Sequence, residues 1–177
     1  MAKLVGHTLA VVGDITAVDG PTTVATANGL GQRNPTGFRA FDDAGNEYVY
    51  AAGVASVAAG DWVFYNQVGT FTMVRLINDA GGAGPSQAGS AGVAQAAIVA
   101  SCWGWVAIFG NVTVANVATV GAPTASVALY RTSTNSRLST TANAKDSVFG
   151  AYLVGAAVNN IGPVSLNYPF VQDQSTL

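Results

Sequence analysis

Charge is what this sequence lacks most. Asp, Glu, Lys and Arg make up only 9% of its 177 residues, whereas a typical soluble domain carries about 25%. Seven Lys and Arg against nine Asp and Glu give a formal net charge of -2. Proteins that bind the nucleic-acid backbone need clustered Lys and Arg. The charge balance therefore excludes a basic nucleic-acid-binding protein.

Histidine and cysteine each occur once, as His7 and Cys102. A single residue of each type excludes a multi-ligand His/Cys metal site and an intrachain disulfide. Nucleophilic catalysis needs a base beside its nucleophile, and the only His lies near the start of the chain. We predict no catalytic residue, no cofactor and no enzymatic activity. Cys102 is expected to be a small buried hydrophobic residue.

Two short patterns imitate known sites without completing them. The 84–88 stretch approaches a nucleophile elbow, but Ala88 replaces the second glycine of that motif. Asp42, Asp43 and Glu47 lack the alternating ligand spacing of a calcium loop. We therefore expect a flexible linker at the first pattern and a solvated turn at the second.

The composition favours strands over helices. Ala, Val and Gly supply 31, 24 and 21 residues, while Glu occurs once and Lys twice. Long surface helices use Glu, Lys, Arg and Leu, whereas Val and Thr favour strands and Gly and Asn favour turns. The predicted fold is mainly β, an antiparallel sandwich or small barrel with an extended N-terminal arm.

The chain divides by composition into two parts. Residues 1–45 hold short apolar patches separated by Gly, Asp and Pro, which is typical of an arm. Residues 46–177 form the predicted β domain. A loop at 79–92, rich in Gly, Ala, Ser and Pro, can divide this domain into two halves.

Apolar runs bounded by turn residues predict the strands of the domain. Strands are expected at 47–51, 61–66, 70–78, 103–109, 112–117, 127–132, 148–158 and 164–168. The first three are expected to form a meander of antiparallel neighbours. Residues 93–99 fit either a helix or a buried strand, and 159–163 are expected to form the last turn.

The uncharged stretch 91–110 is long enough to cross a membrane as a helix. However, the nearest basic residues, Arg75 and Arg131, are too distant to anchor it, and its aromatic and β-branched residues favour a strand. No signal-peptide cleavage site is evident near the N-terminus. We expect a soluble intracellular product.

Alternation along 103–109 predicts a strand covered on both sides. Trp103, Trp105, Ala107 and Phe109 fall on one face, and the opposite face is also apolar. The 70–78 strand has no polar face either, and it includes Arg75. That arginine either lays its stem along the sheet or forms an ion pair with another subunit.

Five segments resemble the small β-rich decoration, or cement, proteins of tailed bacteriophage capsids. They are Glu47-Tyr48-Val49-Tyr50, Ala58-Ala59-Gly60-Asp61-Trp62-Val63, Gly92-Val93-Ala94-Gln95-Ala96-Ala97-Ile98, Gly104-Trp105-Val106-Ala107-Ile108-Phe109-Gly110, and residues 146–155. The resemblance covers residues 46–158 and rests on the order of strands and turns. The first 45 residues depart from it.

The resemblance implies a structural virion protein, made in the host cytoplasm, that binds the capsid exterior and stabilises the shell. The implied partners are the major capsid protein and copies of the chain in a trimer or dimer, with no nucleic acid and no membrane. Interface cores are poor in charged residues, as this chain is. The candidate contacts are Arg33, Phe38 and Arg39 in the arm, together with Arg75. The arm can reach a neighbour or pack on its own body, and the sequence leaves both open.

Two other functional classes fit the composition. A phage tail-tube or fibre subunit would be similarly poor in charge. A carbohydrate-binding β-module could stack sugars on Trp62, Trp103 and Trp105. The latter two are better explained as core or interface residues, since their strand is apolar on both sides.

Overall fold

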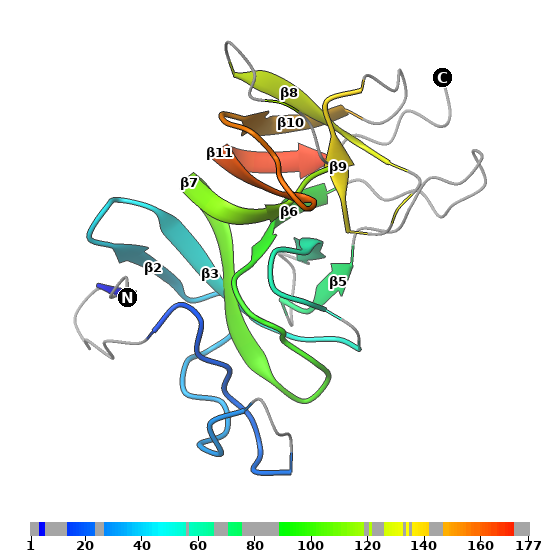
Figure 1. Ribbon diagram of the computed structural model, residues 1–177. Coiled ribbons are helices and arrows are strands. Elements are labelled where there is room, and N and C mark those ends of the chain that lie inside the picture. Colours follow the sequence, from blue (N-terminus) through cyan, green and yellow to red (C-terminus); the bar gives the residue numbers. More distant parts are fainter. Residues whose placement is uncertain are drawn as a thin grey trace.

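The computed structural model describes residues 4–5, 14–23, 27–55, 57–65, 71–75, 89–118, 121, 126–132, 134, 136–141 and 147–171, with backbone alone for 4–5 and 73–75. These residues form eleven strands and no helix (Figure 1), which confirms the mainly β class. The strands are β1 (Leu4–Val5), β2 (Arg39–Asp42), β3 (Glu47–Ala52), β4 (Trp62–Tyr65), β5 (Met73–Arg75), β6 (Gly89–Ala94), β7 (Trp103–Asn116), β8 (Val127–Arg131), β9 (Leu138–Ser139), β10 (Ser147–Leu153) and β11 (Ile161–Val171).

All eleven strands belong to one hydrogen-bonded network. The main path runs β1-β2-β3-β7-β6-β11-β10-β8-β9, and β4 joins it through β6 and carries β5. The pairings between these strands are antiparallel. Within the described part of the chain the two ends of the path do not pair with each other, so the sheet is open.

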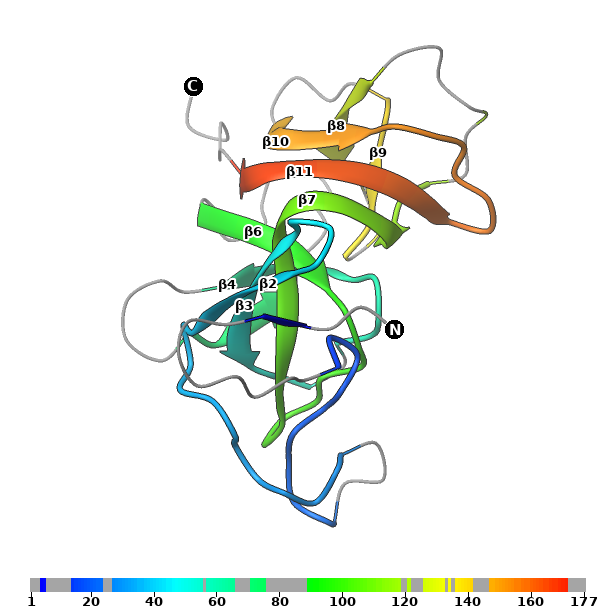
Figure 2. The ribbon, with the colours of Figure 1, turned by 90° about the vertical axis from the view of Figure 1, so that its left-hand side faces the viewer.

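The sheet folds where β6, β7 and β11 meet, because each of these strands pairs with the other two. The first half of β7 pairs with β3, and its second half pairs with β11. The end of β6 pairs with β7 while its beginning pairs with β11. As a result, β2, β3, β4 and β5 make one half of the molecule and β8 to β11 the other, and β7 runs through both (Figures 1 and 2). The arrangement is sandwich-like.

Strand alternation creates two hydrophobic cores. Tyr50 and Trp105 point to a large core that also contains Leu129 and Leu166 from the other half of the molecule. The residues that alternate with them along β3 and β7 point to the opposite side of the sheet. There they form a small core together with residues such as Ile98. The prediction that this strand is covered on both sides is confirmed for residues 104–108, which are buried, while Trp103 is half-buried and Phe109 is exposed. Phe109 departs from the predicted face, because the register shifts by one residue opposite β3.

The predicted meander of 47–78 is correct for its second pairing, since β4 pairs with β5, but wrong for its first, since β3 does not pair with β4. β3 pairs with β2 and β7, while β4 pairs with β5 and β6. Because β3 is apolar on both faces, it needs a central place in the sheet, and β7 supplies a partner with the same property. Local turn signals do not reveal such a pairing between distant segments.

Two other segments differ from their expected structure. Residues 89–92 of the predicted loop form the beginning of β6, which leaves 79–88 outside the described residues. The strands expected at 103–109 and 112–117 join into one 14-residue strand, which contains Gly110. This glycine has φ of +96°, a conformation that side chains with a Cβ rarely adopt.

The 91–110 stretch spans β6 and the first half of β7. Among the described residues, no helix is long and apolar enough to span a membrane.

Parts of the first 45 residues that the structure describes are joined to the body by strand pairing. β2 pairs with β3, and β1 pairs with β2 at the edge of the sheet. Between 14 and 38 the described chain runs without regular strands, apart from a bridge between Asp19 and Trp103.

Replacing Trp105 by Ala should lower the free energy of unfolding by about 3–5 kcal/mol. The ring is buried in the large core against Tyr50 and Phe38, so its removal leaves a cavity. Urea unfolding measures the loss. The exposed Thr113→Ala variant is the control and should change stability by less than about 0.5 kcal/mol. An equally small effect at Trp105 would contradict its place in the core.

Candidate functional site

Arg33 and Phe38 make their contacts within the chain. The Arg33 Nε atom donates to Asp19 Oδ1 at 2.6 Å. The Phe38 ring lies 6.3 Å from the Trp105 ring, centroid to centroid. Both residues hold the N-terminal segment to the body. Arg75 lies in β5, where its side chain falls outside the described residues.

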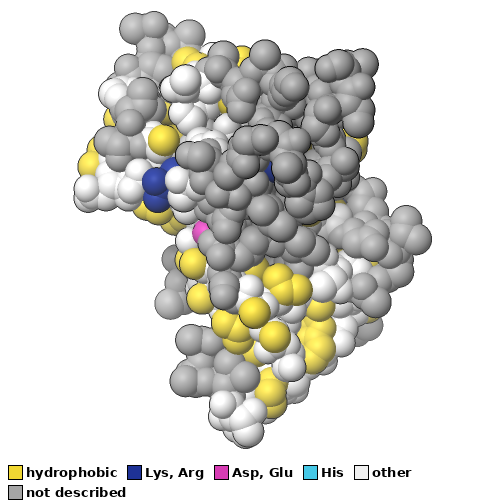
Figure 3. All heavy atoms as spheres, turned by 90° about the vertical axis from the view of Figure 1, so that its right-hand side faces the viewer, with side chains coloured by type: hydrophobic (Ala, Val, Ile, Leu, Met, Phe, Trp, Pro, Cys, Tyr) yellow, Lys and Arg dark blue, Asp and Glu magenta, His cyan; other side chains and the backbone are white. Residues whose placement is uncertain are grey.

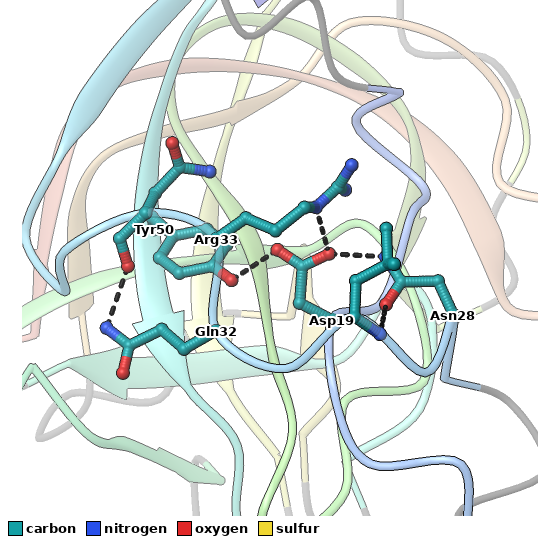
Figure 4. A network of polar contacts seen from close by, with 7 residues as sticks. Asp19, Asn28, Gln32, Arg33 and Tyr50 are labelled. Atoms are coloured by element: carbon teal, nitrogen blue, oxygen red, sulfur yellow. Dashed lines mark hydrogen bonds and ion pairs between the residues drawn. The ribbon is translucent and has the colours of Figure 1, made fainter.

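Asp19 is the buried centre of this attachment (Figure 4). Its carboxylate accepts hydrogen bonds from Asn28 Nδ2 at 2.6 Å, from Arg33 and from the Tyr50 hydroxyl. Its backbone exchanges two hydrogen bonds with Trp103, at 2.9 and 2.8 Å. Burial raises the pKa of Tyr50, and the neighbouring Asp19 carboxylate raises it further. This Asp19 cluster therefore joins the N-terminal segment to β3 and β7.

Asp42 organises the turn between β2 and β3. Its oxygens accept hydrogen bonds from the backbone amides of Ala44 and Asn46, the Asn46 side chain and the Tyr48 hydroxyl, at 2.8–3.0 Å. Burial alone would raise the pKa of Asp42, but these hydrogen bonds outweigh it and place the pKa below its ordinary value. A carboxylate surrounded by donors is suited to holding a turn. No group of three potential metal ligands occurs among the described residues.

Glu47 connects β2, β3 and β11. It is buried and accepts hydrogen bonds from Arg39 Nη1 at 2.8 Å and from the Tyr168 hydroxyl at 2.7 Å. The Arg39 guanidinium, whose side chain is 47% exposed, lies 6.0 Å from the centre of the Tyr168 ring. The hydrogen bond to Glu47 raises the pKa of Tyr168, with burial as the second cause. The arginine proposed as a contact residue thus sits at the edge of a fixed polar cluster.

An exposed aromatic surface surrounds this cluster. We call it the aromatic face, and its exposed fractions run from 37 to 52%. It consists of Phe41, Phe109, Phe149, Tyr168 and Phe170. The rings of Phe109 and Tyr168 contact each other with centroids 5.3 Å apart.

Strand register places the first part of this face on one side of the sheet. Phe41 lies opposite Glu47, Glu47 opposite Phe109, and Phe109 opposite Asn167. Residues directly opposite each other on antiparallel strands share a side. Tyr48, next to Glu47, points to the large core. This row of residues therefore points away from the large core.

A bulge in β11 adds the remaining rings. Tyr168 has φ of +47°, which resets the alternation so that Tyr168 and Phe170 are exposed while Pro169 is buried. Phe170 lies directly opposite Phe149 of β10. Four exposed aromatic residues therefore belong to three adjoining strands, β7, β11 and β10.

A second exposed apolar surface lies at the end of the β10–β11 hairpin. Val154, Val158 and Ile161 are exposed there, and we call this group the hairpin tip. Asn159 and Asn160 form the turn with positive φ values. Such a two-residue turn matches the twist of the strands it joins, and Val158 and Ile161 exchange backbone hydrogen bonds at 2.9 and 3.0 Å. The tip is therefore a rigid apolar projection.

Charged side chains are also sparse among the described residues on the face that Figure 3 shows. There they form only small separate spots. Hydrophobic side chains gather below the middle of this view.

The tryptophans are not part of these exposed surfaces. Trp62 and Trp105 are buried in the large core, and Trp103 is half-buried against it. Neither buried indole can stack on a sugar. Cys102 is buried, as expected, and burial raises the pKa of its thiol.

Sequence reasoning missed all five rings of the aromatic face. A Phe at an alternating strand position signals burial unless the covering layer is known, and the alternation along 103–109 groups Phe109 with the core tryptophans. The Tyr168-Pro169 pair was the available signal, because proline cannot donate a hydrogen bond within a sheet and often marks a bulge.

Comparisons with protein-family models, curated proteins and solved structures found no match to this chain.

Replacing Asp19 by Asn should lower the free energy of unfolding by about 1.5–3 kcal/mol, because hydrogen bonds to a charged group are lost. The loosened segment should also be cut faster by trypsin after Arg33. Unfolding curves and timed digestion measure the two effects. Leu30→Ala, an exposed change in the same segment, serves as the control. A digestion rate equal to that of the unmodified chain would show that Asp19 does not hold the segment.

The stability contributed by Asp42 should depend on pH. Since its pKa is lower in the folded state, the contribution is complete above the unfolded pKa of about 3.9 and is lost as pH falls through the folded pKa. The difference in unfolding free energy between the unmodified chain and Asp42→Asn should therefore shrink between pH 6 and pH 2.5. Asp43→Asn, a change at an exposed turn residue, should keep the pH dependence of the unmodified chain. Parallel pH curves for Asp42→Asn and the unmodified chain would contradict the assignment.

Proposed function

We propose that this chain is a structural protein of a bacteriophage virion that binds the outer surface of the capsid and stabilises the shell. Its partner in this role is the major capsid protein. One observation carries the proposal: a body with sixteen charged residues in 177 exposes eleven large hydrophobic side chains among its described residues. Apolar surface of this extent is typical of proteins that function in contact with others.

The roles of three buried carboxylates support a non-catalytic protein. Asp19, Asp42 and Glu47 are buried, and each accepts hydrogen bonds that join separate parts of the fold. A catalytic acid or base must instead reach a substrate. These carboxylates serve the rigidity of the body, which a shell-stabilising protein needs.

The hairpin tip is the surface we assign to the capsid. It is apolar and uncharged, and its turn is held by backbone hydrogen bonds. A preformed projection loses little conformational freedom when it docks. Many copies bound to one shell would then stabilise it through contacts that are individually modest.

The burial of Trp62 and Trp105 in the large core argues against the alternative of a carbohydrate-binding module, since only Trp103 keeps part of its surface exposed. A tail-tube or fibre subunit differs from the proposal in its location on the virion. Immunogold labelling of purified virions with an antibody to this chain separates these roles. Label over the heads is expected, and label confined to the tails would overturn the proposal.

Replacing Val158 by Glu should weaken binding to shells that lack the chain by at least about tenfold, since it places a charge in an apolar contact. Co-sedimentation of purified chain with such shells measures the binding. The matched control is Leu30→Glu, which places the same charge at an exposed leucine of the N-terminal segment. Equal binding by the two variants would exclude the hairpin tip as the capsid contact.

A further inference from the structure

The aromatic face is an apolar surface that we expect another macromolecule to cover. Four of the seven Phe residues of the chain lie on it, and a phenyl ring has no hydrogen-bonding group. An aromatic side chain buries about 150–250 Å² when fully enclosed, so the five exposed rings leave roughly 350–550 Å² in contact with solvent. The largest apolar patch of a typical monomer measures about 300–600 Å². The exposed area of these five rings alone therefore lies within the range for the largest apolar patch of a monomer.

We propose that the aromatic face is the contact between two copies of this chain, related by a two-fold axis. A standard interface buries about 800 Å² on each partner. The five rings supply about half of this area or more, and the polar residues between them, such as Asn167 and Arg39, lie on the same side of the sheet. The area available is therefore sufficient for a specific dimer.

The charge distribution favours a copy as the partner. In a two-fold contact the same patch occurs on both sides, so a patch with net charge repels itself. Strands β7, β10 and β11 contain no Asp, Glu, Lys or Arg. Among the residues that the structure describes, the charges placed beside these rings are Arg39 and Glu47, which neutralise each other through an ion pair of 2.8 Å. Two such faces can meet without repulsion.

The rigidity of the face favours a specific contact. Its rings project from paired strands, and the Tyr168 hydroxyl is bound to buried Glu47. Phe109 in turn packs on the Tyr168 ring. Side chains that are already ordered lose less conformational entropy on binding.

A second copy is also the partner available earliest. It is present at equal concentration as soon as the chain is made. An exposed Phe surface left uncovered would favour aggregation. The inference does not rest on capsid binding, which we assign to the hairpin tip.

The test is sedimentation equilibrium of the purified full chain between 1 and 100 μM. The unmodified chain should be a dimer. Phe149→Glu and Phe170→Glu should each raise the dimer dissociation constant at least about tenfold, because each places a like charge on both faces. Val158→Glu adds the same charge at the hairpin tip and should leave the dimer intact.

A mixing experiment tests the two-fold arrangement directly. Phe149→Glu and Phe149→Lys should each be weakened alone, but their equimolar mixture should form a heterodimer, because one face then carries the opposite charge to the other. Circular dichroism and thermal unfolding verify that each variant is folded. Should the charged variants unfold, Phe149→Ser removes the ring without adding charge and should still raise the dissociation constant.

Several outcomes would overturn the inference. They are a monomeric chain at 100 μM, a dimer unaffected by the changes at Phe149 and Phe170, and equal disruption by Val158→Glu. A monomer that binds shells and loses this binding on Phe149→Glu would assign the face to the capsid instead. A dimer that binds no shell would leave this inference intact while removing the proposed function.

Discussion

The rest of the structure depends on covering both sides of one long strand. β7 is apolar on both faces along its first half, so that half must lie inside the molecule. Its partners β3 and β6 share this property, and together they separate the large core from the small one. The second half of β7 pairs with β11 and carries the sheet into the other half of the molecule. One strand thus positions two cores and both halves.

The few charged residues are used mainly inside this framework. Asp19 joins the N-terminal segment to β3 and β7, Asp42 fixes the β2–β3 turn, and Glu47 connects that hairpin to β11. Each buried carboxylate is compensated by several hydrogen bonds, which offsets the cost of removing it from water.

The two apolar surfaces differ in a way that suits separate roles. The aromatic face is broad and lies on adjoining strands, whereas the hairpin tip is small and projects at one end of the sheet. A broad neutral face is suited to a copy of itself, and a narrow projection can enter a depression on a larger partner. A dimer formed through the first would present two tips, which would raise the effective concentration of the second contact.

The sequence by itself determined the fold class, the position of most strands and the burial of 104–108 on both sides. These follow from composition, turn residues and alternation, which are local properties of the chain. The tertiary structure decided that β3 pairs with β7 rather than β4, and that Arg33 and Phe38 bind within the chain. It also decided that Phe109 and Phe170 are exposed, because bulges and distant pairings determine which side of a strand is covered. An isolated strand carries the same alternation whether its apolar side meets a core or solvent, so only the assembled sheet could reveal the candidate contact surfaces.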